Sequence, residues 1–205
     1  SVAADTMDSS KYVLTDGGPV YAMPKDYYAP GEANEAVQQA LLNLIRQVLR
    51  VAGDSEEDAA KTAQQVYDLQ KEFSMNGPGL EDQLNVELVY NPHTKAELQS
   101  LYSNCDIEGF LKTIGITNFD KCIVSEVENA KKVNSYLTLE NLDLLKKYTK
   151  YCMYLSCSSY LTSAHYKAMN DFNISVLGAV EEKSMDTVAK ELTQSLFVWE
   201  FGKLY

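Results

Sequence analysis

The chain has 205 residues, of which 45% are hydrophobic and 23% charged, which is typical of a globular protein large enough to bury a core. Its 29 acidic residues outnumber the 18 basic ones and give a formal net charge of -11. This balance argues against a nucleic-acid-binding protein, because such proteins carry a basic surface. No stretch approaches about 18 consecutive apolar residues, so the sequence predicts no membrane span.

The first 31 residues are predicted to form a short irregular arm. They are rich in turn-forming residues, and only "KYVLT" at 11–15 has the character of a short strand. The N-terminus has no basic region followed by an apolar stretch, so it does not resemble a signal peptide. It also lacks an initiator methionine, which suggests that the chain starts inside a longer one.

From Glu32 onwards the apolar residues follow a helical period. A first amphipathic helix ends at Gly53. Ser55 and Asp58 then form the pattern of a capping box for a second helix, which ends at "NGPG" (76–79). The two apolar stripes comprise Val37, Leu41, Leu44, Ile45, Val48 and Ala52, followed by Ala59, Ala63, Val66, Leu69 and Phe73. Two helices joined by so short a turn are expected to pack as an antiparallel hairpin.

The middle of the chain contains shorter elements. Thr94 is predicted to cap a helix, with Glu97 completing its capping box. "IEGFLKTIGI" (107–116) predicts a short helix ending at Gly115, and "KCIVSE" (121–126) is either an isolated strand or a buried link.

The rest of the chain is predicted to be nearly all helix, because no proline follows Pro92 and no glycine lies between Gly115 and Gly178. Breaks are expected near 135–138 and within "SCSSYLTS", and the last helix carries Trp199. The sequence therefore predicts an all-α fold of packed antiparallel helices with at most one or two short strands. Residues 1–205 form a single domain in this interpretation, with an irregular arm (1–31) and a helical part (32–205).

The four cysteines contain no CxxC pair, so they predict neither a zinc knuckle nor a thioredoxin-like motif. Cys152 and Cys157 lie five residues apart in a predicted helix, which places their Cα atoms about 8 Å apart, too far for a disulfide. Cys105 and Cys122 could pair in an exported protein, but two free buried thiols are equally compatible. The compartment therefore stays open between the cytoplasm and the cell envelope or extracellular space.

Neither histidine lies in a recognisable catalytic or metal-binding motif. His93 and Glu97 could share a metal, but His93 comes just before the predicted helix cap, which favours a surface contact. His165 follows several hydroxyl side chains in "SSYLTSAH", so a small hydrolase that uses His165 is one hypothesis. The carboxylate pairs are expected at helix starts or surface turns: Glu56–Glu57, Glu81–Asp82 and Glu181–Glu182. No catalytic, cofactor-binding or metal-binding residue is predicted.

Three segments, taken in order, point to a known family. "MPKDYY" (23–28) resembles a Leu-Pro-x-x-x-Tyr-Tyr motif, "YNPHTKAELQ" (90–99) a Tyr-Asn-x-x-Thr-x-x-x-Leu/Ile-Gln segment, and "FGKLY" (201–205) a Gly-Arg/Lys-Leu-Tyr motif. All three occur in the same order in the neprilysin-like zinc metallopeptidases, which include neprilysin, the endothelin-converting enzymes and bacterial oligopeptidases. Two departures suggest a divergent bacterial member: Ala22-Met23-Pro24 replaces Gly-Leu-Pro, and "DGGPVY" replaces a glutamine-containing link.

The resemblance implies that the chain is part of the helical, non-catalytic domain of a larger enzyme. In that family a thermolysin-like domain binds zinc through HExxH and a downstream glutamate, and neither is present in this sequence. The chain stops at Tyr205, where the family's chain continues towards the catalytic domain. This fragment is therefore expected to hold no cofactor and to be inactive alone, while the parent enzyme binds zinc.

The resemblance also implies a role and partners. The helical domain faces the zinc domain of the same chain across a cavity, admits only small peptide substrates, and could steer cationic ones with its acidic surface. The alternative is a stand-alone acidic helical interaction module, and the reading frame downstream of Tyr205 distinguishes the two. For the first motif we expect Pro24 to fix the backbone while Tyr27 and Tyr28 anchor the arm in the helical core.

Overall fold

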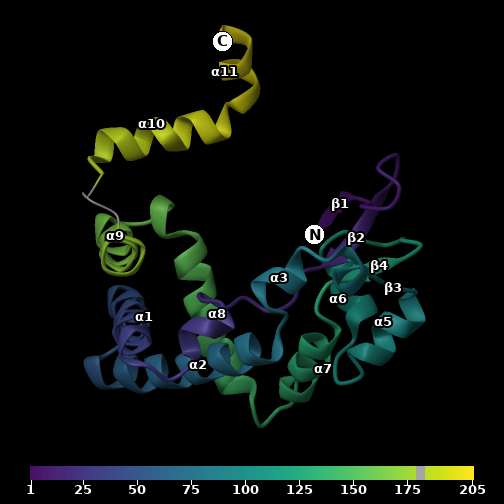
Figure 1. The fold of residues 1–205 in the computed structure, drawn as a ribbon, viewed down its shortest axis with the longest axis horizontal. Coiled ribbons are helices and arrows are strands. Elements are labelled where there is room, and N and C mark those ends of the chain that lie inside the picture. The colour runs from purple at the N-terminus through teal and green to yellow at the C-terminus, as the bar shows by residue number, and fades with distance from the viewer. Residues whose placement is uncertain (179–182) are drawn as a thin grey trace.

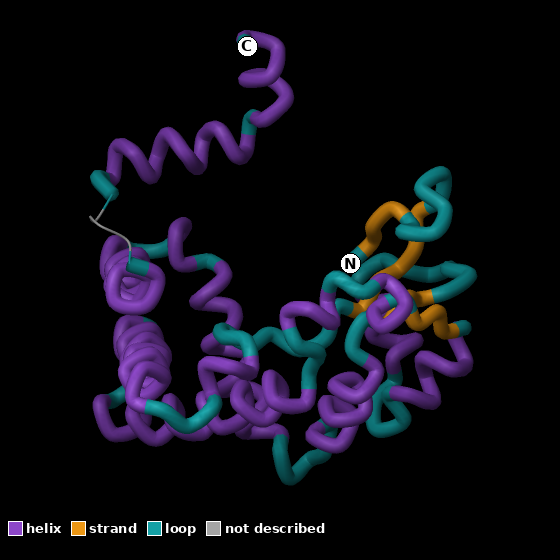
Figure 2. The backbone as a smooth tube through the Cα atoms, viewed as in Figure 1, coloured by secondary structure: helices purple, strands orange, loops and turns teal. Residues whose placement is uncertain are grey.

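Helices make up most of the chain, and a small sheet lies at one end (Figures 1 and 2). This computed structural model describes residues 1–178 and 183–205. The predicted carboxylate pair Glu181–Glu182 lies outside the described residues. No helix in the part that the structure describes is both long and apolar enough to cross a membrane.

The centre of the helical body is the pair α1 (Glu32–Val51) and α2 (Glu56–Asn76). The two helices pack against each other, as their apolar stripes predict. Ser55 caps α2 by accepting a hydrogen bond of 3.1 Å from the backbone N–H of Asp58. Ile45 and Val66 are fully buried in the core between them, and complete burial of such a side chain stabilises the fold by about 1.5–3 kcal/mol.

Two further long helices complete this body. These are α8 (Leu142–Ser156) and α9 (Ser163–Leu177), which are joined by the 3₁₀ turn η2 (Ser158–Tyr160). Tyr151 of α8 is fully buried against the α1–α2 pair, whereas Tyr160 is exposed. The predicted breaks near 135–138 and within "SCSSYLTS" are confirmed, because helices end at Tyr136 and Ser156.

The sheet has four short strands in the order β1-β2-β4-β3. Their bounds are β1 (Val2–Ala4), β2 (Tyr12–Asp16), β3 (Asn91–His93) and β4 (Cys122–Val124). The pairs β1–β2 and β3–β4 are antiparallel, and β2–β4 is parallel. A second apolar core joins the sheet to α5 (Lys95–Leu101), α6 (Ile107–Thr113) and α7 (Val127–Tyr136). The short helices α3 (Leu80–Gln83) and α4 (Val86–Val89) lead from α2 to this part.

The prediction of a mostly helical fold is confirmed, but that of at most one or two strands is wrong. "KYVLT" and "KCIVSE" do form strands, yet β1 and β3 were not expected. Strands of three residues are too short to show alternation, and Pro92 argues against a strand in the sequence. The structure tolerates Pro92 because β3 is at the edge of the sheet. The arm is likewise less irregular than expected, since β1 and β2 lie in it.

The chain ends in two helices where one was expected. These are α10 (Met185–Leu196) and α11 (Val198–Leu204), and the chain bends between them at Phe197. Figure 1 shows both helices projecting beyond α9, away from α1 and α2.

Candidate functional site

The Pro-Tyr-Tyr segment is anchored by one of its two tyrosines. Tyr28 lies at the end of the 3₁₀ turn η1 (Lys25–Tyr28) and is 2% exposed, whereas Tyr27 is 42% exposed. The ring of Tyr28 packs against that of Tyr67 on α2, with centroids 5.6 Å apart. The expected anchor is therefore Tyr28 alone.

Side chains of the helical body also hold the backbone of this arm. Gln70 Oε1 on α2 accepts the backbone N–H of Ala22 at 2.7 Å, and the Ser74 hydroxyl donates to the carbonyl of Met23 at 2.8 Å. Such bonds satisfy backbone groups that burial would otherwise leave unpaired. These hydrogen bonds hold the chain in place where it passes from the sheet to the helical body.

Glu126 connects the arm to the start of α7. Its carboxylate accepts hydrogen bonds from the Tyr21 hydroxyl at 3.0 Å and from the Asn129 amide at 2.5 Å. Burial, followed by the charge of Glu126, raises the pKa of Tyr21 to about 12. Gly18 has a φ of +85°, and a Cβ there would lie 2.8 Å from the Glu126 carboxyl carbon, so this turn favours glycine.

An ion pair between the buried Asp5 and the partly exposed Lys121 fastens the β1–β2 connection to the far side of the sheet. Lys121 Nζ lies 2.7 Å from Asp5 Oδ2 and 2.7 Å from the Tyr90 hydroxyl, which itself donates to Asp5 Oδ1 at 2.9 Å. The hydrogen bond from Lys121 is the main reason why the pKa of Asp5 falls to about 2. Every group of this cluster has a partner, so we assign it a structural role.

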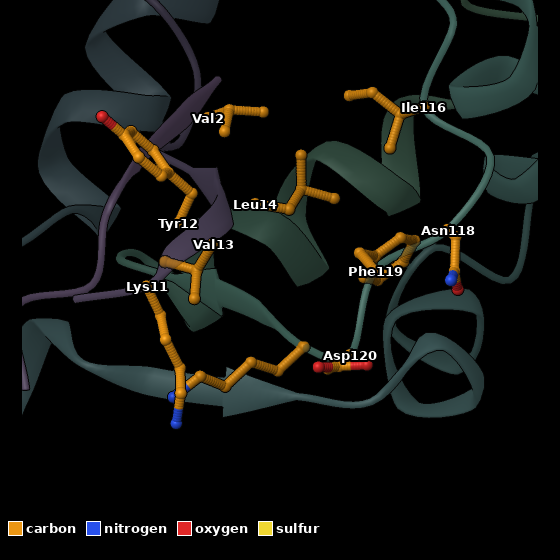
Figure 3. Close-up of a pocket in the computed structure, with 10 residues that line it drawn as sticks. Val2, Lys11, Tyr12, Val13, Leu14, Ile116, Asn118, Phe119 and Asp120 are labelled. Carbon is orange, nitrogen blue, oxygen red and sulfur yellow. The ribbon is translucent and has the colours of Figure 1, made fainter. Parts of the chain in front are cut away.

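A cavity of about 300 Å³ lies between the β1–β2 hairpin and the loop before β4, and its lining side chains are drawn in Figure 3. Leu14, Ile116 and Phe119 contribute apolar walls. Its two lysines are neutralised, Lys11 by Asp8 at 2.9 Å and Lys121 by Asp5. The cavity therefore offers apolar contact without an unpaired positive charge for an anion.

The hydrogen bonds of His93 and Glu97 show what each of these two side chains binds. His93 Nδ1 lies 2.9 Å from the carbonyl of Asn91. The carboxylate of Glu97 accepts the backbone N–H and the hydroxyl of Thr94, both at 2.8 Å, as the predicted capping box requires. The geometry thus assigns Glu97 to the helix cap rather than to a shared metal.

His165 is buried beside a hydroxyl but has no carboxylate to orient it in the described part of the chain. Its Nδ1 lies 2.9 Å from Thr162 Oγ1, and its ring stacks on Tyr154 with centroids 5.3 Å apart. Its Nε2 is buried without a hydrogen-bond partner among these residues. A triad requires a base oriented by a third group, so this arrangement does not support the hydrolase hypothesis.

All four cysteines are free, so Cys105 and Cys122 do not form a disulfide. Burial, followed by the charge of Asp16, raises the pKa of Cys122 to about 11. Within 1–178 and 183–205, no three His, Cys, Asp or Glu side chains come together as metal ligands. A zinc site commonly uses three or four such ligands, so the described residues do not fit one. The pairs Glu56–Glu57 and Glu81–Asp82 lie in the first turns of helices, as predicted.

The C-terminal helices expose an unusual number of large apolar side chains. We define the C-terminal apolar surface as Leu196, Phe197, Val198, Trp199, Phe201 and Leu204. Trp199 is 81% exposed and Leu204 is 85% exposed. Large exposed apolar patches mark interaction surfaces. Helical periodicity does not predict this surface, although the apolar run "LFVWEF" (196–201) is a signal for it in the sequence.

The family model and the similar proteins all point to the same family of peptidases. The N-terminal model of peptidase family M13 matches residues 1–205. Endothelin-converting enzyme 1 of Mus musculus is 27% identical over 177 residues, which are 83% of this chain and 23% of that protein. The neutral endopeptidase of Lactobacillus helveticus is 25% identical over 208 residues, covering all of this chain and 32% of that protein.

Solved structures share the fold. A crystal structure of the Mycobacterium tuberculosis zinc metalloprotease Zmp1 with an inhibitor superposes with a TM-score of 0.88 at 21% identity, covering 100% of this chain and 32% of that one. PepO from Lactobacillus rhamnosis gives a TM-score of 0.73 at 19% identity, covering 92% and 30% of the two chains. The present chain spans about a quarter to a third of the length of these relatives.

Proposed function

Since this chain belongs to peptidase family M13, we propose that it is a non-catalytic helical domain of a zinc metalloendopeptidase that cleaves small peptides. The observation that carries the proposal is the match over all 205 residues to a family whose solved relatives include a zinc metalloprotease. The described residues supply no set of metal ligands. In this account the zinc, its ligands and the general base come from another part of the same polypeptide, and no catalytic, cofactor-binding or metal-binding residue lies in residues 1–205.

The C-terminal apolar surface is the best candidate for contact with that part. Its side chains lie on α10 and α11, which project from the helical body (Figure 1). Burial of an apolar surface contributes about 25 cal/mol for each Å² removed from water. Covering Trp199 and its neighbours would therefore fix α10 and α11 against the zinc domain.

We further propose that the domain limits the size of the substrates. A rigid helical wall opposite the metal would admit short flexible peptides and exclude folded proteins. The anchored arm supports this role, because Tyr28, Gln70 and Ser74 tie the sheet to the helical body and stiffen the wall.

Substrate size provides the test. The parent protein would be given one cleavable sequence in three forms: a short peptide, a longer unstructured peptide, and an exposed loop of a folded protein. We expect kcat/KM to fall steeply for the folded form while the short peptide is cut. Equal cleavage of all three forms would contradict the size-filter role. A stop codon directly after Tyr205 would instead favour the stand-alone interaction module.

A further inference from the structure

A second apolar depression adjoins the cavity of Figure 3, with which it shares Val2, Leu14 and Ile116. Its volume is about 430 Å³. We call it the α6 groove, because Ile107, Phe110, Leu111 and Ile114 of α6 and its C-terminal end form one wall. Phe110 is 58% exposed and Ile114 is 55% exposed. The second core of the protein therefore opens to the surface at this groove.

The pairing of the first strand shows where an extension of the chain would go. Ser1 and Thr15 exchange both backbone hydrogen bonds, each of 2.8 Å, so the antiparallel ladder of β1 and β2 is intact up to the first residue. β2 continues for one more residue, to Asp16, which pairs with Val124 on β4. In this register, a residue joined to the amino group of Ser1 would lie opposite Asp16.

The alternation of side chains along a strand then sets the direction of that residue. Residues two apart point to the same face of a sheet. The residue before Ser1 would therefore share the face of Val2, and Val2 lines the α6 groove. A short extension of β1 would thus bring its side chains to Phe110 and Ile114.

We propose that the α6 groove is filled by apolar side chains of the residues that directly precede Ser1 in the parent polypeptide. This sequence spans only 23% to 32% of the length of its relatives, so the proposed parent polypeptide contains chain outside residues 1–205 that could supply these side chains. A second copy is a poorer occupant, because two chains of net charge -11 repel each other. The inference rests on the proposed longer parent protein but not on its peptidase activity.

The test is photo-crosslinking in the full-length parent protein. The photoreactive analogue p-benzoylphenylalanine would replace Phe110, and cross-linked peptides would be mapped by mass spectrometry after irradiation. We expect cross-links to residues immediately before Ser1. The matched control carries the same analogue in place of Leu139, which is 90% exposed in the link between α7 and α8, and should give no such product.

The remaining outcomes would overturn the inference. They are a cross-link to a distant part of the parent chain, an intermolecular product between two copies, no cross-link at all, or a parent protein that begins at Ser1. A second measurement guards against disturbed folding: hydrogen exchange of peptides covering 107–116 in the unmodified parent should be slow. Fast exchange there would contradict the proposal. Because neither readout needs hydrolysis, a parent without peptidase activity could still confirm the filled groove.

Discussion

The aromatic ring of Tyr28 lies against that of Tyr67, with centroids 5.6 Å apart and ring planes inclined by 56°. This contact joins the Pro-Tyr-Tyr arm to α2, and such aromatic pairs contribute about 0.5–1.5 kcal/mol beyond their burial. The Tyr28 hydroxyl is buried and has no hydrogen-bond partner in the described part of the chain. The ring of Tyr28, rather than its hydroxyl, is therefore what stabilises the arm.

Because Tyr28 is buried and Tyr27 is exposed, we expect substitutions of these two tyrosines to differ in their effect on stability. Tyr28→Ala should lower the free energy of unfolding by about 3–5 kcal/mol, because it empties a filled core position. Tyr27→Ala is the matched control and should change it by less than about 0.5 kcal/mol, as at most surface positions. Tyr28→Phe should be close to neutral. Urea denaturation measures all three, and a large loss in Tyr28→Phe would show that the hydroxyl does have a partner.

The ion pair of the buried Asp5 with the partly exposed Lys121 predicts that stability depends on pH in the acid range. The folded-state pKa of Asp5 is about 2, below its ordinary value of about 3.9. The pair therefore stabilises the fold fully above about pH 4, and this contribution is lost as the pH falls through about 2. The stability difference between the protein and its Asp5→Asn variant should shrink over that window. Denaturant unfolding at several pH values measures it, and a difference that stays constant would rule out the lowered pKa of Asp5.

The cysteines should differ in reactivity. Cys122 is buried in β4 and has a pKa raised to about 11. At pH 8, therefore, only a small fraction of the Cys122 side chains is in the reactive thiolate form. Cys157 at the end of α8 is only half-buried. Iodoacetamide should label Cys157 in the folded protein and reach Cys122 only after unfolding. Peptide mapping measures both rates, and equal labelling would disprove the burial of Cys122.

Substitution of Trp199 tests whether the C-terminal apolar surface is an interface in the parent protein. Its side chain is 81% exposed here, so Trp199→Ala should leave the stability of residues 1–205 unchanged. In the parent protein the same substitution should lower Tm, because the proposed interface would lose a large buried ring. Leu139→Ala is the control, with no expected shift in either protein. Thermal unfolding of the two forms provides the measurement, and equal Tm values for the parent and its Trp199→Ala variant would contradict the interface.

Local signals in the sequence predicted the local structure well. The caps at Ser55 and Thr94 and the stripes of α1 and α2 were predicted because each depends on residues within a few positions of one another. The strand β3 was missed because Pro92 is acceptable only at a sheet edge, and an edge is a property of the whole sheet.

The contacts that join distant segments of the chain could not be predicted from the sequence pattern. Asp5 and Lys121 are 116 positions apart, and Tyr21 and Glu126 are 105 apart. No periodicity links such pairs, so only the fold could identify them. The ordered motifs nevertheless identified the family, because family descent preserves segments whose physical purpose a single sequence does not reveal.

The most direct test of the account is the zinc content and peptidase activity of two proteins, the parent and residues 1–205 alone. Elemental analysis and hydrolysis of a short fluorogenic peptide would be measured on both. The account predicts about one zinc per chain and hydrolysis in the parent, with neither in residues 1–205. One equivalent of zinc or hydrolysis in residues 1–205 alone, or a parent with neither, would contradict it.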